Sequence, residues 1–244
     1  MSSNAKVSVI IPVYNAQATI ARALQSIIEQ TYSDKEIIVI NGLSTDGSLE
    51  IIHQFAPQIT HIISEKDNGV YSAINKGLKL CSGDWVYILG ADDYISDDSI
   101  IAKMMSDVGE EKMLIFGNII NEKIENRAVP RKHISTFDNF LYWRNTTHQQ
   151  SVFYHKNLFR AFKFDETYKV LADYDFHLFL LNSEAESKYI NLDIAHCTAG
   201  GLSKQFVWNL YREELKIKKN RLPTWAYFLN VLLVRIKYLI KRIS

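Results

Sequence analysis

Two adjacent carboxylates, Asp92 and Asp93, follow directly after the apolar run Trp85–Leu89. Such a run predicts a buried strand, and the ligands of open α/β sheets bind where the strands end. A hard divalent cation relieves a concentration of negative charge of this kind, and Mg²⁺ or Mn²⁺ commonly bridges to substrate phosphates. The pair therefore favours a metal and phosphate site. A solvated turn is the alternative, because Asp is common in turns.

Small and polar residues follow the other strands that we predict in the first half of the chain. They lie at Pro12–Asn15, Asn41–Asp46 and Glu65–Gly69, and their side chains and backbone N–H groups suit a nucleotide. The sequence contains neither G-x-G-x-x-G after its first strand nor the P-loop pattern G-x-x-x-x-G-K-[ST]. An ordinary dinucleotide-binding dehydrogenase and a P-loop NTPase are therefore disfavoured.

The elements that must position these residues alternate between strand and helix. Strands are predicted at Val7–Pro12, Glu36–Ile40, Thr60–Ser64 and Trp85–Leu89, with helical patterns between them. This rhythm predicts βαβ units and a mainly parallel sheet with helices on both faces, an α/β fold. After Ile100 the rhythm changes, and we predict a strand at Met113–Ile120, a helix at Asp173–Leu181 and loops at Asn121–Lys132 and Ala199–Ser203.

The composition is that of a globular protein with an uneven distribution of charge. Of 244 residues, 47% are hydrophobic and 23% charged, which disfavours disordered and fibrous classes. The net charge of +1 conceals a basic segment, because residues 204–244 carry ten Lys and Arg against two Asp and Glu. Two distant cysteines, Cys81 and Cys197, and the lack of a long apolar run favour a cytoplasmic protein without a membrane span.

The C-terminal segment Leu222–Ile243 is predicted to form a basic, partly amphipathic helix. Its apolar side chains recur at helical spacing from Trp225 to Ile243, and Lys237, Lys241 and Arg242 lie off that face. The helix either packs on the domain or lies on an anionic membrane. Nucleic acid is a poorer partner, since the rest of the chain is acidic.

A series of motifs in order makes the chain resemble the family 2 glycosyltransferases, which have the GT-A fold. The matching segments are VSVIIPVYNA, EIIVINGLSTDGS, SEKDNGVYSAINKGLKLCSGDWVYILGADD, THQQSVFYHK, VLADYDFHLFL and AGGLS. The closest likeness is to bacterial enzymes that build capsule, O-antigen or colanic-acid-type polysaccharides. The resemblance covers about Lys6 to Ser203 and implies a nucleotide-binding half (residues 1–93), an acceptor half (94–203) and a basic tail (204–244).

The resemblance assigns a nucleotide-sugar site to residues of the first half. The residues that match the family's donor-binding positions are Pro12, Tyr14, Asn15, Asn41, Asp67, Tyr71, Asn75, Lys76 and Asp92. Asp93 matches the metal-binding carboxylate of the DXD-like motif, and Gly90 stands where that motif often begins with an acidic residue. Asn41 likewise replaces a usual Asp, and Asn both donates and accepts hydrogen bonds.

In the second half, Asp173 matches the family's general base, which takes the proton of the acceptor hydroxyl in an inverting transfer. Asp175 is the rival for this role, and Asp173 alone would read as a helix cap. His177, four residues after Asp173, forms with it either a metal pair or a hydrogen bond. His148, Gln149 and Lys204 match positions on the acceptor side.

These assignments predict an inverting, metal-dependent transfer of a sugar from a nucleotide-diphosphate sugar to a saccharide or polyprenyl-linked saccharide. The enzyme would be cytoplasmic and peripheral on the inner face of the membrane. A non-catalytic sugar-nucleotide-binding module and a sugar nucleotidyltransferase are the alternatives.

Overall fold

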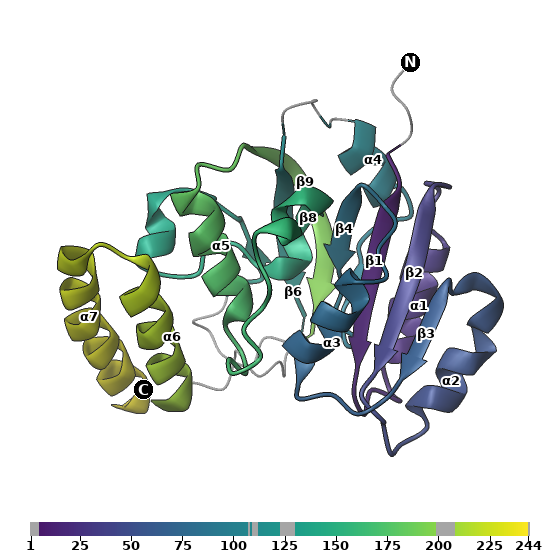
Figure 1. Ribbon diagram of the computed structural model, residues 1–244, viewed down its shortest axis with the longest axis horizontal. Helices are drawn as coiled ribbons and strands as arrows, with labels where there is room; N and C mark the ends of the chain where they lie inside the picture. Colours follow the sequence, from purple (N-terminus) through teal and green to yellow (C-terminus); the bar gives the residue numbers. More distant parts are fainter. Residues whose placement is uncertain (1–4, 107, 109–111, 123–129, 199–207, 244) are drawn as a thin grey trace.

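The computed structural model describes residues 5–106, 108, 112–122, 130–198 and 208–243, and its strands form one nine-stranded sheet (Figure 1). The strand order is β3-β2-β1-β4-β8-β6-β9-β5, and β7 pairs with β6.

The first half comprises β1 (Val7–Val13), α1 (Ile20–Ile28), β2 (Lys35–Asn41), α2 (Ser48–Gln54), β3 (His61–Ser64), α3 (Val70–Leu78) and β4 (Trp85–Ile88). The second half comprises β5 (Tyr94–Ile95), α4 (Ile100–Ser106), β6 (Leu114–Asn121), β7 (Lys132–His133), β8 (Val152–His155), α5 (Ala172–Asn182), β9 (Ser187–Cys197), α6 (Trp208–Arg221) and α7 (Thr224–Ile243).

The four strands of the first half run parallel, as the alternation predicts. In their register, Val9 of β1 lies opposite Ile37 of β2 and Tyr87 of β4. The carboxyl ends of these strands therefore meet at one edge of the sheet, where the polar loops follow. The near-continuous apolar runs of β1 and β2 are typical of strands that are covered on both faces.

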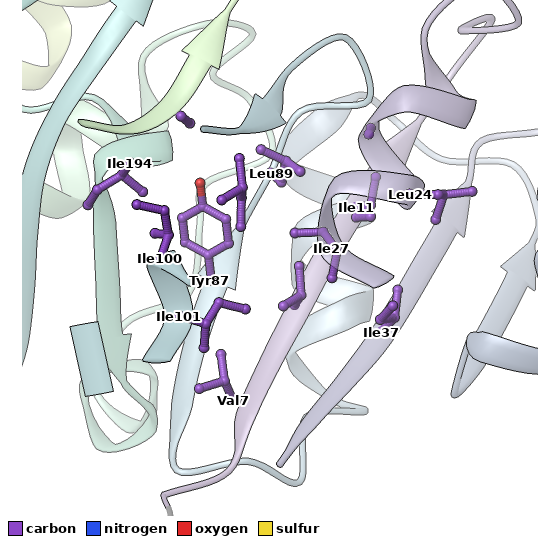
Figure 2. Close-up of a cluster of buried hydrophobic side chains, with 14 of the residues drawn as sticks. Val7, Ile11, Leu24, Ile27, Ile37, Tyr87, Leu89, Ile100, Ile101 and Ile194 are labelled. Carbon is purple, nitrogen blue, oxygen red and sulfur yellow. The ribbon is translucent and has the colours of Figure 1, made fainter. Parts of the chain in front are cut away.

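One face of the sheet packs against α1, α2 and α4. Figure 2 shows the ring of Tyr87 between Ile100 and Ile101 of α4 and the residues of β1 and α1, with Ile27 the nearest labelled residue of α1. Ile27 and Tyr87 are fully buried in this cluster. The spacing of the buried α1 residues, Ile20, Leu24 and Ile27, is the helical spacing that the sequence predicts.

The opposite face packs against α3 and α5, and α6 and α7 lie beyond α5 at one end of the molecule (Figure 1). Ile10 of β1, Ile74 of α3, Phe176 of α5 and Ile217 of α6 belong to one buried cluster. The predicted α/β fold with helices on both faces is therefore confirmed.

The second half departs from the regular alternation. β8 lies antiparallel between β4 and β6, whereas β9 runs parallel to β6 through two register shifts. The predicted strand at Met113–Ile120 corresponds to β6, and the predicted helix at Asp173–Leu181 corresponds to α5. The strand β9 was not predicted, because Lys188 and Asp193 interrupt its apolar residues and leave much of it half-exposed.

The predicted helix at Leu222–Ile243 corresponds to α7, and a helix that was not predicted, α6, precedes it and contributes to the core. Ile217 and Lys218 of α6 are fully buried, as are Ala226 and Asn230 of α7. The predicted division after residue 203 falls outside the described residues and stays a prediction. Among the helices in the described part of the chain, none combines the length and the apolar character that crossing a bilayer requires.

Candidate active site

The loop after β4 places Asp92 and Asp93 at the carboxyl edge of the sheet. The Asp93 side chain is 4% exposed. Its Oδ2 accepts a hydrogen bond from Gln150 Nε2 at 2.8 Å, and its Oδ1 accepts one from the backbone N–H of Thr198 at 3.0 Å. Thr198 Oγ1 also donates to Asp92 Oδ2 at 3.3 Å. The residue that follows β9 and the segment before β8 therefore orient these carboxylates.

The two carboxylates converge on the backbone of Gly90. A Cβ atom at this position would lie 2.7 Å from Asp93 Oδ2 and 2.9 Å from Asp92 Oδ1. A side chain at this position would therefore require both carboxylates to move.

The converging oxygens fit a hard divalent cation. Mg²⁺ and Mn²⁺ prefer carboxylate oxygens and are commonly held by one or two of them together with substrate phosphates. The described residues contain no cluster of three or more His, Cys, Asp or Glu side chains that could hold a metal alone. A cation at Asp93 would therefore need oxygens from a substrate or water to complete its coordination.

A network of side chains supports the backbone of this loop. Arg22 of α1 donates to the Asp92 carbonyl at 3.3 Å, and its guanidinium carbon lies 4.2 Å from the centroid of the Tyr94 ring. Tyr94 donates its hydroxyl hydrogen bond to Glu122, and His196 stacks on the Tyr94 ring at 4.6 Å. The hydrogen bond from Tyr94 is the main cause that lowers the pKa of Glu122, against the opposing effect of burial. These residues carry no local signal in the sequence, since only the fold brings them together.

The loops after β1 and β2 are joined through Asn15. Its backbone adopts φ 47°, its N–H donates to Ser44 Oγ at 3.0 Å, and its Oδ1 accepts from the Thr45 N–H at 2.8 Å. The neighbouring Tyr14 side chain is 65% exposed. Asn15 therefore organises the loop, while Tyr14 is open to a ligand.

Asn41 is fully buried, and its amide already has protein partners. Nδ2 donates to Ser64 Oγ at 2.8 Å, and Oδ1 accepts from Ser44 Oγ at 2.5 Å. The carboxylate of Asp67 lies against Gly42, since a Cβ atom there would be 2.4 Å from Asp67 Oδ2. The fold thus brings Asp67 beside the loop of Asn41, as both donor-site assignments require.

Two further donor-site candidates on α3 hold neighbouring segments of the chain. Asn75 is buried, donates to the Phe164 carbonyl at 2.9 Å and accepts from the Phe164 N–H at 3.1 Å. Lys76 donates to the Lys66 carbonyl at 2.8 Å and pairs with Glu65 at 2.9 Å. Their role in donor binding stays a prediction, and so does that of the half-buried Pro12.

Asp173 lies in the first turn of α5, where it is partly buried. The Tyr71 hydroxyl donates to Asp173 Oδ1 at 3.2 Å and to the Val170 carbonyl at 2.7 Å. Burial raises the pKa of Asp173 to about 6, although hydrogen bonds from the Tyr174 backbone, Tyr71 and Asn145 oppose the rise. A carboxyl with this pKa is suited to accept a proton near neutral pH.

Asp175 points to a different partner. It is 5% exposed, and its two oxygens accept hydrogen bonds from Arg221 Nε at 2.7 Å and Nη2 at 2.9 Å. His177 is buried and forms a hydrogen bond with the Tyr154 hydroxyl at 2.7 Å. Asp175 therefore belongs to the contact of α5 with α6, and His177 to the core rather than to a metal pair with Asp173.

The acceptor-side candidates are only partly described. The half-buried His148 packs edge-on against His133, with 4.6 Å between the ring centroids. Gln149 begins a short 3₁₀ helix, but it is the next residue, Gln150, that contacts Asp93. The sequence signal, two adjacent glutamines, does not say which of them faces the carboxylate. Lys204 lies outside the described residues.

An open cleft of about 750 Å³ lies between the loop before α3 and the segment that leads to α5. It is lined by Asn68, Lys163, Phe164, Asp165, Glu166, Thr167 and Lys169. Lys169 Nζ crosses this cleft and donates to the Asn68 carbonyl at 3.1 Å. The cleft therefore adjoins both the stretch assigned to the donor and the segment before Asp173.

Residues 8–186 match the family described as glycosyl transferase family 2. A PGL/p-HBAD biosynthesis glycosyltransferase of Mycobacterium tuberculosis is 34% identical over 208 residues, which cover 82% of this chain and 80% of that protein. A poly(ribitol-phosphate) beta-glucosyltransferase of Bacillus spizizenii is 27% identical over 132 residues, 52% of this chain and 20% of that protein.

Two solved structures share the fold. S. aureus TarS 1-349 in complex with UDP-GlcNAc has a TM-score of 0.67 at 21% identity and covers 87% of this chain and 65% of its own. Glucosyl-3-phosphoglycerate synthase of Mycobacterium tuberculosis, in complex with Mn²⁺, UDP and phosphoglyceric acid, has a TM-score of 0.65 at 14% identity and covers 88% and 78%. With the match over most of its length, the chain belongs to glycosyl transferase family 2 and is a glycosyltransferase of the GT-A fold.

Proposed function

We propose that this glycosyltransferase moves a sugar from a nucleotide-diphosphate sugar to a hydroxyl of a saccharide or lipid-linked saccharide, with inversion at the anomeric carbon. The observation that carries the proposal is the environment of Asp173. A partly buried carboxyl with a pKa of about 6, held by a tyrosine hydroxyl, is a suitable base for this reaction.

In this reaction Asp173 accepts the proton of the acceptor hydroxyl. The acceptor oxygen forms a bond to the anomeric carbon while the bond from that carbon to the diphosphate breaks on the opposite face. The products are the inverted glycoside and a nucleoside diphosphate. A correctly placed base contributes roughly 10²–10⁴ in rate.

At the end of β4, Asp93 would hold a divalent cation, and Asp92 would approach the ribose of the donor. When bound, Mn²⁺ or Mg²⁺ would neutralise the developing charge of the departing diphosphate. Gln150 and Thr198 orient the Asp93 carboxylate by their hydrogen bonds, as outer-shell groups commonly do for metal ligands. The Mn²⁺ and UDP named for a neighbour of the same fold support this assignment.

The donor and acceptor classes rest on the relatives. The names of these proteins include UDP-GlcNAc, PGL/p-HBAD biosynthesis and poly(ribitol-phosphate). We infer a nucleotide-diphosphate sugar as the donor and a surface-polysaccharide or glycolipid precursor as the acceptor.

We also infer that α7 contacts an anionic membrane from the cytoplasmic side. The side of α7 that faces the domain carries Ala226, Asn230 and Val234, which are all buried. Its outward side exposes large apolar residues, namely Trp225, Phe228, Leu229, Leu232, Leu233 and Ile236. A helix that turns its most apolar side away from its own protein is suited to lie in a membrane interface.

Two basic residues of α6 do not contribute to such a contact. Lys218 is fully buried, and Arg221 is paired with Asp175. Membrane attraction would therefore depend on the apolar side of α7 more than the sequence suggests. Nucleic acid is not a partner in this proposal.

Asp173→Asn tests the catalytic assignment. We expect turnover to fall by roughly 10²–10⁴, while the donor and Mn²⁺ still raise the melting temperature, because ligand binding to the folded state is retained. Asp97→Asn is the matched control, since Asp97 caps the segment before α4 through the Ser99 N–H at 2.9 Å. Equal turnover of the two variants would leave Asp173 with only a structural role in the first turn of α5 and contradict the proposal.

Phe228→Ser together with Leu232→Ser tests the membrane contact. We expect this double variant to sediment less with phosphatidylglycerol vesicles than the unchanged protein does, because apolar area enters the interface. Phe140→Ser is the control, since Phe140 is 66% exposed in a different segment. Unchanged sedimentation of the double variant would exclude α7 as the contact.

A further inference from the structure

Glu213 of α6 binds three consecutive backbone amides. Its Oε1 accepts hydrogen bonds from the N–H groups of Val170 at 2.9 Å and Leu171 at 2.7 Å, and its Oε2 accepts one from Lys169 at 3.1 Å. These residues directly precede α5, whose N-cap residue Leu171 makes no capping bond with its own side chain. The carboxylate on α6 thus satisfies amides that the local sequence leaves unpaired.

The segment held by Glu213 leads to Asp173 through one shared hydroxyl. Tyr71 donates to the carbonyl of Val170 at 2.7 Å and to Asp173 Oδ1 at 3.2 Å. A tyrosine hydroxyl has a single proton, so the two oxygens share it. Any shift of the Val170 peptide would change the strength of the hydrogen bond that the Tyr71 hydroxyl donates to Asp173.

α6 also supports the opposite side of Asp173. The buried Lys218 donates to the Trp143 carbonyl at 3.0 Å, and Glu214 accepts from Lys218 at 2.5 Å. Two residues after Trp143, the side chain of Asn145 forms a hydrogen bond with Asp173. The segment that leads to Asp173 and the segment that carries Asn145 are therefore both attached to α6.

We propose that Glu213 is a positioning residue for Asp173, which makes α6 a structural part of the catalytic site rather than a tail. The inference rests on the proposed function of Asp173 as the base. Glu213 acts through the 169–171 backbone and Tyr71, and it needs no contact with a substrate.

The acid limb of the pH–rate profile reports this role. Among the described residues, Tyr71 from α3 and Tyr154 from β8 are titratable groups that interact with the charge of Asp173, and Glu213 from α6 interacts in turn with Tyr71. Burial, and next the charge of Asp173, hold the pKa of both tyrosines well above the usual value, so these hydroxyls stay neutral through the limb. Activity is lost as the pH falls through the pKa of Asp173, about 6.

Loss of the Glu213 clamp would loosen the start of α5 and admit water to Asp173. The pKa of Asp173 would then fall toward its usual 3.8, because desolvation is the main cause that raises it. We expect Glu213→Ala to lower kcat by roughly 10- to 100-fold, as small misplacements of catalytic groups do, and to move the acid limb to lower pH. Glu213→Gln retains one oxygen acceptor, so its kcat and its acid limb should lie between those of Glu213→Ala and the unchanged enzyme.

Glu36→Gln is the matched control for a loss of stability. Glu36 also accepts several hydrogen bonds, from Ser8 Oγ and from the Ser82 N–H at 2.7 Å among others, but it lies where β1 and β2 begin, away from the site. This variant should lower the melting temperature and leave the acid limb unmoved.

The experiment measures kcat, KM for the donor and the acid limb for the unchanged enzyme and the three variants, on the full chain at a temperature where all are folded. A graded loss of kcat and a shifted limb in the Glu213 variants alone support the proposal. An unshifted limb in Glu213→Ala, or the same profile as in Glu36→Gln, overturns it. Neither result affects the role of Asp173, which would fail only if Asp173→Asn kept its turnover.

Discussion

Two shielded carboxylates of this protein, Glu36 and Asp173, have opposite electrostatic environments. Burial raises the pKa of Glu36, but hydrogen bonds from Lys6, Ser8 and Ser82 outweigh this effect and lower its pKa to about 2. At Asp173 burial dominates, and the pKa rises to about 6. The first carboxylate joins the beginnings of β1 and β2 to the turn before β4. The second lies at the start of α5, where its hydrogen bonds do not outweigh the effect of burial.

This difference separates a structural carboxylate from a catalytic one. A group that is saturated with donors is stable as an anion and has little tendency to take a proton. A group whose desolvation outweighs the hydrogen bonds that it accepts gains from protonation. Perturbed carboxylates of the second kind cluster at functional sites, and family membership agrees with that interpretation for Asp173.

The largest expected effect in this comparison is the loss of stability in Glu36→Gln. The folded-state pKa of about 2 lies below the ordinary 4.5, so ionised Glu36 stabilises the fold above pH 4.5, by about 3 kcal/mol at pH 7. That contribution is lost as the pH falls from 4.5 toward 2. Urea unfolding should therefore show a difference between variant and parent at pH 7 that falls by about half at pH 3. An equal difference at both pH values would show that the charge of Glu36 is not what stabilises the fold.

Asp173→Asn should change stability in the opposite direction. The folded-state pKa of about 6 lies above the ordinary 3.8, so the stability associated with Asp173 is complete below pH 3.8 and is lost as the pH rises through 6. At pH 7.5 the neutral amide should make the protein more stable by about 1–2 kcal/mol, although it abolishes most turnover. Chemical unfolding at pH 7.5 and pH 4 measures this gain, which should shrink at the lower pH. If the variant is less stable than the parent at pH 7.5, burial does not destabilise the ionised Asp173, and the contrast with Glu36 is wrong.

Much of the scaffold on which the comparison depends can be predicted from sequence. The apolar runs of β1, β2 and β4 and the helical spacing of Ile20, Leu24 and Ile27 are local patterns, and the structure confirms them. β8 has only four residues and is defined by its neighbours β4 and β6, so no local pattern identifies it. β9 is half-exposed, and its alternation is broken by charge.

The site is predictable where residue type decides its chemistry and not where a tertiary contact decides it. Asp92 and Asp93 are notable in the sequence because they follow an apolar strand, whereas Asp173 is assigned by the resemblance to the family. The contact of Gln150 rather than Gln149 with Asp93, and the bond between Asn41 and Ser64, depend on side-chain directions that only the fold sets. Glu213 is 42 residues from Leu171. Nothing in a basic tail with two acidic residues indicates that one of them contacts the segment before α5.

The smallest expected effect concerns Asp175, which tests whether the contrast holds between neighbours on one helix. Asp175 accepts two hydrogen bonds from Arg221, so it is a carboxylate paired with a cation, two residues from Asp173, which has no such partner among its hydrogen-bond donors. Asp175→Asn keeps one oxygen acceptor, and Arg221 retains access to water with 28% of its side chain exposed. We expect a loss of about 1 kcal/mol in the free energy of unfolding and turnover within a few-fold of the parent. Parallel measurement of turnover in Asp173→Asn and Asp175→Asn decides between the two residues, because a greater loss in Asp175→Asn would move the base to the residue that pairs with α6.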